Sequence, residues 1–129
     1  MSSPFALSFE FFPPKTPEGV TKLAAVRQQL YALKPLFCSV TYGAGGSTQD
    51  GTLQAVRSIL AEGADGAPHF SCIGASRGEV LDIARKYWDQ GIRHIVALRG
   101  DAPAGTIKYE PRADGFAYAA DLMSGLKTV

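Results

Sequence analysis

Short apolar runs alternate with longer amphipathic stretches along the whole chain, and this alternation most restricts the possible folds. The apolar runs lack the regular polar–apolar alternation of a strand that has one face in water. Near-continuous apolar strands separated by helices are typical of a parallel sheet buried on both faces. The pattern therefore predicts an α/β protein, built either as a doubly wound sheet or as a barrel.

The predicted strands and their flanking signals divide the chain into four strand–helix units. The strands are expected at residues 7–12, 36–41, 69–73 and 92–98. Thr16 is a suitable N-cap, and Pro17 suits the first helical position because an N–H there would have no helical partner. Ser76 and Glu79 have the spacing of a capping box that opens a later helix, and Gly91 is expected to end that helix.

Apolar residues recur at helical spacing between the strands. We expect the first helix to end at Pro35, the second to begin near Ser47 and Thr48, and the last to cover residues 116–127. The residues expected to face the core from the first three helices are Leu23, Val26, Leu30, Leu33, Leu53, Val56, Leu60, Val80, Ile83, Ala84 and Tyr87.

The composition is that of one soluble globular unit. The chain has 129 residues, with 13 Lys+Arg against 12 Asp+Glu and a formal net charge of +1, so we expect no nucleic-acid partner. No apolar run approaches the roughly 18 residues of a membrane span, and no secretory signal is evident. We therefore expect a cytoplasmic protein without membrane contact.

The cysteines and histidines do not form a recognisable metal-binding pattern. Cys38 and Cys72 each lie inside an apolar run, outside any Cys-x-x-Cys arrangement. His69 and His94 have no second ligand at a familiar spacing. We expect two buried thiols in a reducing compartment and no metal site.

Glu10 is the most informative single residue, because it is a carboxyl group inside the aromatic run Ser-Phe-Glu-Phe-Phe-Pro-Pro. Burial disfavours the charged form of a carboxyl group, which is the adjustment that a general acid near neutral pH requires. We therefore expect a buried acid. The alternative is that Glu10 faces outward or forms a buried ion pair.

Further polar residues fall at or near the carboxyl ends of predicted strands, where ligands gather in both candidate architectures. Thr41 and Tyr42 offer a hydroxyl group and a ring able to stack on a planar cofactor. Arg99, Gly100 and Asp101 offer a cation, a permissive backbone and an anion. Both groups also have a plain interpretation as turns, and the glycines after Tyr42 match neither a P-loop nor a complete G-x-G-x-x-G.

Four segments, taken in order, resemble the bacterial methylenetetrahydrofolate reductase family. They are Ser-Phe-Glu-Phe-Phe-Pro-Pro at 8–14, Ser-Val-Thr-Tyr-Gly-Ala at 39–44, Ala-Pro-His-Phe-Ser-Cys-Ile at 67–73 and Gly-Ile-Arg-His-Ile-Val-Ala-Leu-Arg-Gly-Asp at 91–101. A Tyr-Ala-Ala-Asp-Leu segment at 118–122 resembles another family segment. The resemblance covers essentially the whole chain, and it implies a (β/α)8 TIM barrel.

The resemblance also implies an activity. Members hold FAD and pass a hydride from NADH or NADPH to 5,10-methylenetetrahydrofolate, giving 5-methyltetrahydrofolate for one-carbon metabolism and methionine biosynthesis. Glu10 matches the family's general acid, and Asp101 matches a catalytic carboxylate that lies between flavin and pterin. The positions that match the family's cofactor-binding residues are Thr41, Tyr42, His69, Arg99, Gly100, Asp101, Tyr118 and Ala119. Thr41 also matches a position that lines the nicotinamide.

The chain holds about four of the eight units that this barrel requires, and a complete barrel takes about 250 residues. Residues 1–129 are thus expected to be the N-terminal half of a FAD-binding reductase barrel, with no second domain. We expect an incomplete enzyme that forms a homo-oligomer, with two open sheet edges and an inner face of Phe, Val, Ile and Leu. The alternative is a non-catalytic half-barrel that self-associates or binds a partner. A doubly wound nucleotide-binding domain is disfavoured, because Pro13-Pro14-Lys15 replaces the glycines of its first turn.

Overall fold

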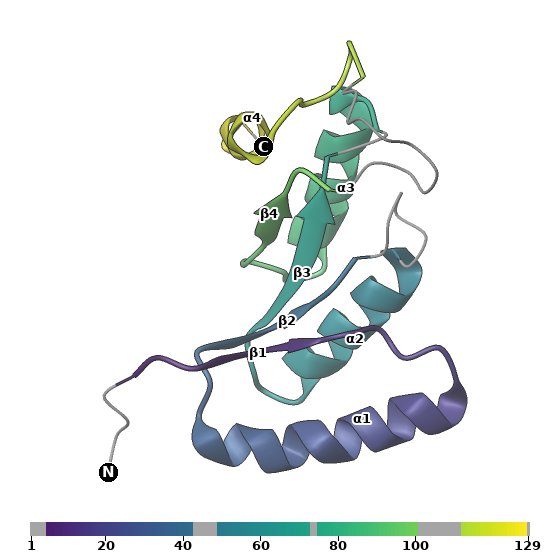
Figure 1. Ribbon diagram of the computed structural model, residues 1–129, viewed down its shortest axis with the longest axis vertical. Coiled ribbons are helices and arrows are strands. Elements are labelled where there is room, and N and C mark those ends of the chain that lie inside the picture. The colour runs from purple at the N-terminus through teal and green to yellow at the C-terminus, as the bar shows by residue number, and fades with distance from the viewer. Residues whose placement is uncertain (1–4, 43–48, 73–74, 101–111, 129) are drawn as a thin grey trace.

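The computed structural model describes residues 5–42, 49–72, 75–100 and 112–128. Its elements, in chain order, are β1 (Ser8–Phe11), α1 (Pro17–Leu30), the 3-10 helix η1 (Tyr31–Leu33), β2 (Phe37–Val40), α2 (Gln49–Ala61), β3 (Gly66–Ser71), α3 (Arg77–Asp89), β4 (Val96–Leu98) and α4 (Ala119–Leu126). The strands form one parallel sheet in the order β1-β2-β3-β4 (Figure 1). This confirms the predicted α/β class, as part of a (β/α)8 barrel with four strand–helix units.

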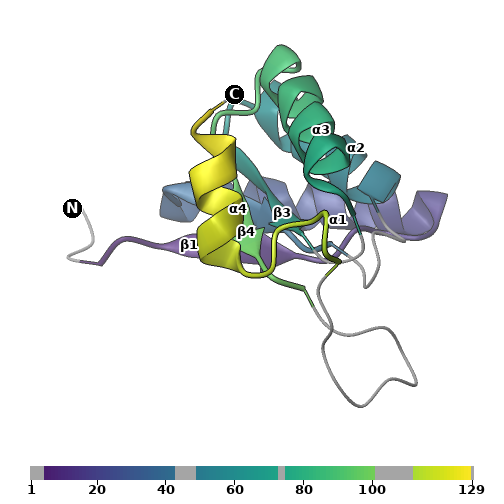
Figure 2. The ribbon, with the colours of Figure 1, turned by 90° about the horizontal axis from the view of Figure 1, so that it is seen from above.

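One face of the sheet carries the hydrophobic core. Phe11, Val40 and Phe70 point from three neighbouring strands into a cluster with residues of α2 and α3, such as Ile59 and Val80. Figure 1 shows α1, α2 and α3 beside the strands that precede them, and α4 packs against β4 and α3 (Figure 2). The helices therefore form the outer layer that a barrel requires.

The opposite face is called the inner face below, and strand register defines its members. Paired residues share a face because side chains alternate along a strand. Within the four strands, the inner face consists of Ser8, Glu10, Phe37, Ser39, Ala67, His69, Ser71, Val96 and Leu98. The expectation of an apolar inner face is wrong for most positions of the first three strands. Phe11 and Phe70 point to the helices, and Phe37 is the one large apolar side chain that these strands place on the inner face.

The predicted helix ends are confirmed where a side chain or a glycine defines them. The Thr16 hydroxyl accepts the Gly19 N–H at 3.0 Å, and Pro17 opens α1. The Ser76 hydroxyl accepts the Glu79 N–H at 3.2 Å at the start of α3. These bonds satisfy amides that have no partner within the first helical turn.

Two strands differ from their predicted bounds. β3 begins at Gly66 instead of residue 69, so that His69 lies within the strand; Pro68 is tolerated because the ladder to β4 begins only at His69. β4 begins at Val96 instead of residue 92. Ile92 is buried beneath α3, whereas the guanidinium of Arg93 lies 3.6 Å from the ring centre of Trp88 and donates to the Trp88 carbonyl at 2.6 Å. These side-chain contacts replace strand pairing over residues 92–95.

Two helices are shorter than predicted. α1 ends at Leu30 and continues as η1, after which Lys34 adopts a left-handed φ of 53° before Pro35. Val26 and Leu33 are 46% and 56% exposed, so the expectation that they face the core is wrong. α4 begins at Ala119 rather than at residue 116, because the backbone N–H of Tyr118 is bonded by the Asp121 carboxylate as an N-cap. The expected start of the second helix at Ser47 and Thr48 lies outside the described residues.

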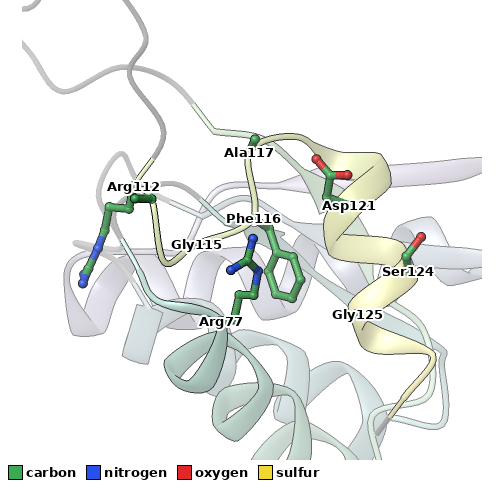
Figure 3. Close-up of a pocket in the computed structure, with 9 residues that line it drawn as sticks. Arg77, Arg112, Gly115, Phe116, Ala117, Asp121, Ser124 and Gly125 are labelled. Carbon is green, nitrogen blue, oxygen red and sulfur yellow. The ribbon is translucent and has the colours of Figure 1, made fainter.

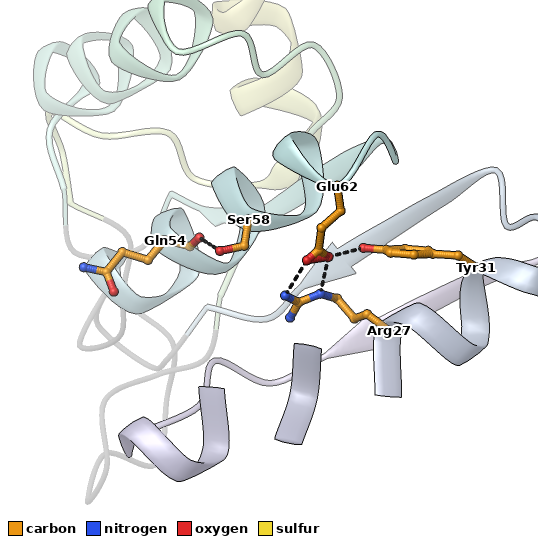
Figure 4. Close-up of polar contacts among 5 residues, drawn as sticks. All are labelled: Arg27, Tyr31, Gln54, Ser58 and Glu62. Carbon is orange, nitrogen blue, oxygen red and sulfur yellow. Dashed lines mark hydrogen bonds and ion pairs between the residues drawn. The ribbon is translucent and has the colours of Figure 1, made fainter. Parts of the chain in front are cut away.

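A bonded network fixes α1 to the end of α2 at the amino end of the sheet (Figure 4). Arg27, only 4% exposed, donates from Nε and from Nη2 to the two carboxylate oxygens of Glu62, at 2.8 and 3.0 Å. The Tyr31 hydroxyl donates to Glu62 at 2.6 Å. The hydrogen bond from Arg27 holds the pKa of Glu62 below its usual value, against the opposing effect of burial. The charge of Arg27 is therefore fully paired inside the structure.

Candidate active site at the carboxyl ends of the strands

Glu10 reaches a partner on the inner face instead of being buried. Its side chain is 55% exposed, and its Oε1 lies 3.0 Å from Nε2 of His69. The expectation of a carboxyl group buried among aromatic rings is wrong, because the neighbouring Phe11 points to the opposite face of β1. The Glu10 carboxyl group is instead accessible and is paired with the His69 imidazole.

Ser39 is the site residue that sequence reasoning missed. It is 5% exposed, and its hydroxyl lies 3.3 Å from Nε2 of His69, which is itself 9% exposed. Glu10, Ser39 and His69 come from β1, β2 and β3, so three adjacent strands contribute one side chain each. The available signal was a polar residue between the apolar Cys38 and Val40 in the second strand.

Thr41 and Tyr42 follow β2 at its carboxyl end. The Thr41 N–H donates to the Phe11 carbonyl at 2.8 Å, and its own carbonyl accepts the hydroxyl of the fully buried Thr52 at 2.6 Å. Burial raises the pKa of Tyr42, and the pKa of Tyr87 is raised by burial and then by the nearby Tyr42. The backbone here is fixed to β1 and α2.

Arg99 and Gly100 follow β4 at the same edge of the sheet. Gly100 has a φ of +92°, a conformation that favours glycine. The exposed Arg99 donates from Nε to the Gly100 carbonyl at 3.4 Å, and its own carbonyl accepts the Cys72 thiol at 3.6 Å. The predicted site residue Asp101 lies outside the described residues.

Tyr118 and Ala119 occupy the start of α4. Tyr118 is 57% exposed at the N-cap, and Ala119 is the first helical residue. Both therefore belong to a different element from the strand residues, although α4 packs against β4. Sequence reasoning predicted the two as cofactor contacts, and this remains a prediction.

A pocket of about 570 Å³ lies between the first turn of α3 and the residues that lead into α4. Figure 3 shows Arg77 beside the ring of Phe116, with Asp121 and Ser124 along α4. The Arg77 guanidinium carbon lies 5.7 Å from the Phe116 ring centre. Sequence reasoning did not single out these residues, because nothing in the local pattern indicates that α3 and α4 meet there.

The described ranges contain no group of three His, Cys, Asp or Glu side chains that could hold a metal ion. None of their helices is both long and apolar enough to cross a membrane.

Comparison with known proteins identifies the family. The family model described as "Methylenetetrahydrofolate reductase" matches residues 2–129. Proteins named 5,10-methylenetetrahydrofolate reductase are 49% identical in Salmonella typhimurium and 48% identical in Escherichia coli, each over 124 residues, or 95% of this chain. An Arabidopsis thaliana protein named methylenetetrahydrofolate reductase (NADH) 1 is 38% identical. This chain spans 40% of the two bacterial relatives and 21% of the plant one. The chain belongs to the methylenetetrahydrofolate reductase family.

Proposed function

We propose that the protein carrying this chain reduces 5,10-methylenetetrahydrofolate to 5-methyltetrahydrofolate, with FAD as its cofactor and NADH or NADPH as the hydride donor. The observation that carries the proposal is Glu10, an exposed carboxyl group at the carboxyl ends of parallel strands, 3.0 Å from an imidazole. Barrel enzymes place their chemistry at this end. The names of the relatives support the substrate, and the plant relative named for NADH favours that donor.

The residues proposed to hold FAD have a suitable chemistry. Arg99 and His69 supply donors for phosphate or ring oxygens, and Gly100 presents backbone without a side chain. Thr41, Tyr42, Tyr118 and Ala119 complete the proposed set. When bound, FAD supplies the hydride transfer between nicotinamide and folate.

Glu10 is the proposed general acid. It protonates the folate, so that the methylene bridge opens to an electrophilic iminium that accepts the hydride. Because the carboxyl group is 55% exposed, a substrate lying over the inner face can reach it without rearrangement of the sheet. Asp101, predicted from sequence, is proposed as the second carboxylate, which helps to bind the folate.

Replacing Glu10 by Gln in the full-length protein that carries this chain tests the assignment. Flavin reduction by NADH or NADPH needs no proton from Glu10, so its rate should be unchanged. Reoxidation of the flavin by methylenetetrahydrofolate should slow by about 100-fold or more, the usual loss when a general acid is removed. Stopped-flow absorbance of the flavin measures both rates. Asp65→Asn is the matched control, because the Asp65 carboxylate precedes β3 at the amino end of the sheet, where it lies 3.2 Å from His94. Normal folate turnover in Glu10→Gln would end the assignment of Glu10 as the general acid.

Residues 1–129 are proposed as the N-terminal half of the reductase barrel, in a cytoplasmic protein that forms a homo-oligomer. Exposed apolar side chains support association, since Phe5, Phe12 and Leu36 are 75%, 76% and 65% exposed. Phe12 directly follows β1, Leu36 directly precedes β2, and Phe5 lies in the segment before β1.

The 129-residue chain alone should therefore self-associate and bind FAD weakly, because only part of the contact set is present. Light scattering combined with a flavin titration measures both properties. A stable oligomer without flavin would favour a non-catalytic half-barrel, whereas a compact monomer that holds FAD stoichiometrically would contradict the half-barrel interpretation.

A further inference from the structure

His69 stands between two oxygens that come from two other strands. Its Nε2 lies 3.0 Å from the Glu10 carboxylate and 3.3 Å from the Ser39 hydroxyl. His69 and Ser39 are 9% and 5% exposed, whereas the Glu10 side chain is 55% exposed. The His69 imidazole and the Ser39 hydroxyl are therefore held inside the structure. The Glu10 carboxyl group is the one of these three groups that solvent and ligands can reach.

A single imidazole nitrogen can serve both protonation states of Glu10. When Glu10 is ionised, a proton on Nε2 donates to the carboxylate. When Glu10 is protonated, its O–H can donate to an unprotonated Nε2. The Ser39 hydroxyl donates or accepts as required, because it has both capacities. Glu10 thus keeps a hydrogen-bond partner before and after it gives up a proton.

We propose that His69 is the positioning residue of Glu10, and that Ser39 holds the imidazole in place for this task. The inference rests on the proposed function, because it takes Glu10 to be the general acid. His69 acts through the direction and partner that it gives to the carboxyl group. Loss of the imidazole leaves the acid present but free to adopt other rotamers, which lowers the rate of proton delivery.

The second histidine provides a matched control at the amino end of the sheet. His94 Nδ1 lies 3.2 Å from the Asp65 carboxylate, and its ring centre lies 4.4 Å from that of Phe37. This pair precedes β3 and β4 and is 41% and 46% exposed. The sequence contains only these two histidines, so their imidazole signals can be separated.

The first measurement is imidazole ¹⁵N NMR on the 129-residue chain labelled at histidine. His94→Gln assigns the spectrum by removing one set of signals. Glu10→Ala and Ser39→Ala should each shift the His69 Nε2 signal and leave the His94 signals unchanged. Asp65→Ala should shift the His94 signals and leave those of His69 unchanged. If Glu10→Ala leaves the His69 signals in place, the contact that carries the proposal is absent and the inference is overturned.

The second measurement uses the full-length FAD-saturated protein. His69→Leu should lower kcat for folate reduction by about 10- to 100-fold with little change in KM, since misplacing a catalytic group costs rate. Because His69 is also a proposed FAD contact, flavin reduction by the nicotinamide serves as the internal reference and should slow much less than folate reduction. His69→Gln should restore part of the loss, because its amide N–H replaces Nε2–H. His94→Gln should match the wild type.

The outcomes separate the two proposals. A wild-type protein that reduces its flavin but never transfers the hydride to folate contradicts the proposed function. An active wild type with equal folate rates in His69→Leu overturns only the positioning role. If His69→Leu loses FAD, Ser39→Ala tests the positioning role instead. Ser39→Ala should slow folate reduction more than nicotinamide oxidation. An equal effect on both rates counts against the inference.

Discussion

The two ends of the sheet each carry a histidine–carboxylate pair, but the pairs have different surroundings. At the carboxyl end, Glu10 is more than half exposed while its partner His69 is buried and also contacts Ser39. At the amino end, His94 and Asp65 are exposed to a similar extent, and the His94 ring makes a tilted contact with the ring of Phe37.

The amino end also contains the Arg27–Tyr31–Glu62 network (Figure 4), in which all three side chains bond to one another through the Glu62 carboxylate. The polar groups of this network are satisfied by bonds to one another. At the carboxyl end, Glu10 and Arg99 keep much of their surface open to solvent. The comparison supports the proposal that the carboxyl end contacts ligands while the amino end contributes stability, the division that barrel enzymes generally show.

The largest expected effect on stability is at Glu62. Glu62→Ala leaves the buried Arg27 charge without its partner, so the free energy of unfolding should fall by about 3 kcal/mol. Urea denaturation of the chain measures this change. Asp82→Ala, which removes a carboxylate from an exposed pair with Arg85, is the control and should cost less than about 0.5 kcal/mol. Equal losses in the two variants would show that the Arg27–Tyr31–Glu62 network contributes no more to stability than an exposed ion pair.

The same network has a signature in pH. The pKa of Glu62 is lowered in the folded state by the Arg27 hydrogen bond, with Tyr31 adding to it. A lowered folded-state pKa contributes stability above the ordinary carboxyl value of about 4.3, and this stability is lost as the pH falls through the folded-state pKa. The wild type should therefore lose stability more steeply than Glu62→Gln below about pH 4.3. If the free energies of unfolding of the two proteins change in parallel with pH, Glu62 does not have the lowered pKa that the network predicts.

An intermediate loss of stability is expected when either of two glycines, one at each end of the sheet, is replaced by alanine. Gly91, which ends α3, and Gly100, which follows β4, have φ values of +89° and +92°. Alanine at either position should cost about 1–2 kcal/mol through the same backbone strain. Only Gly100→Ala should also weaken FAD binding in the full-length protein, as measured by flavin titration. A similar loss of FAD affinity in Gly91→Ala would break the division between the two ends.

The smallest effect is expected for Asp65→Asn. Both members of the Asp65–His94 pair are exposed, and exposed pairs contribute about 0–1 kcal/mol. Thermal unfolding should shift slightly, and both flavin half-reactions should keep their rates. A large loss of folate turnover in this variant would mean that the amino end takes part in function.

Local signals predicted the order of strands and helices, because caps and breakers act within a few residues. Thr16, Ser76 and Gly91 mark helix ends by bonds or dihedral angles that depend on nearby chain alone. The failures are of another kind. Arg93 leaves the strand pattern because it stacks on Trp88, a contact that only the folded structure reveals.

The site was predicted as a collection of residues and not as an arrangement. Glu10 was identified from its unusual neighbours, but its pairing with His69 depends on the register of three strands. A shift of one residue in that register would move every side chain to the opposite face. This is also why the burial of Glu10 was wrongly expected, since the aromatic residues beside it in sequence lie across the sheet in space.

The stacking of Arg93 on Trp88 gives the molecule a built-in optical reporter. Trp88 is the only tryptophan in the sequence, and it lies at the end of α3, near the amino end of the sheet. Its emission should respond to the loss of the Arg93 contact as that end unfolds. The imidazole signals of His69 would report on the carboxyl end of the same chain. Two spectroscopic signals could then follow the two ends of the sheet separately during one denaturation experiment.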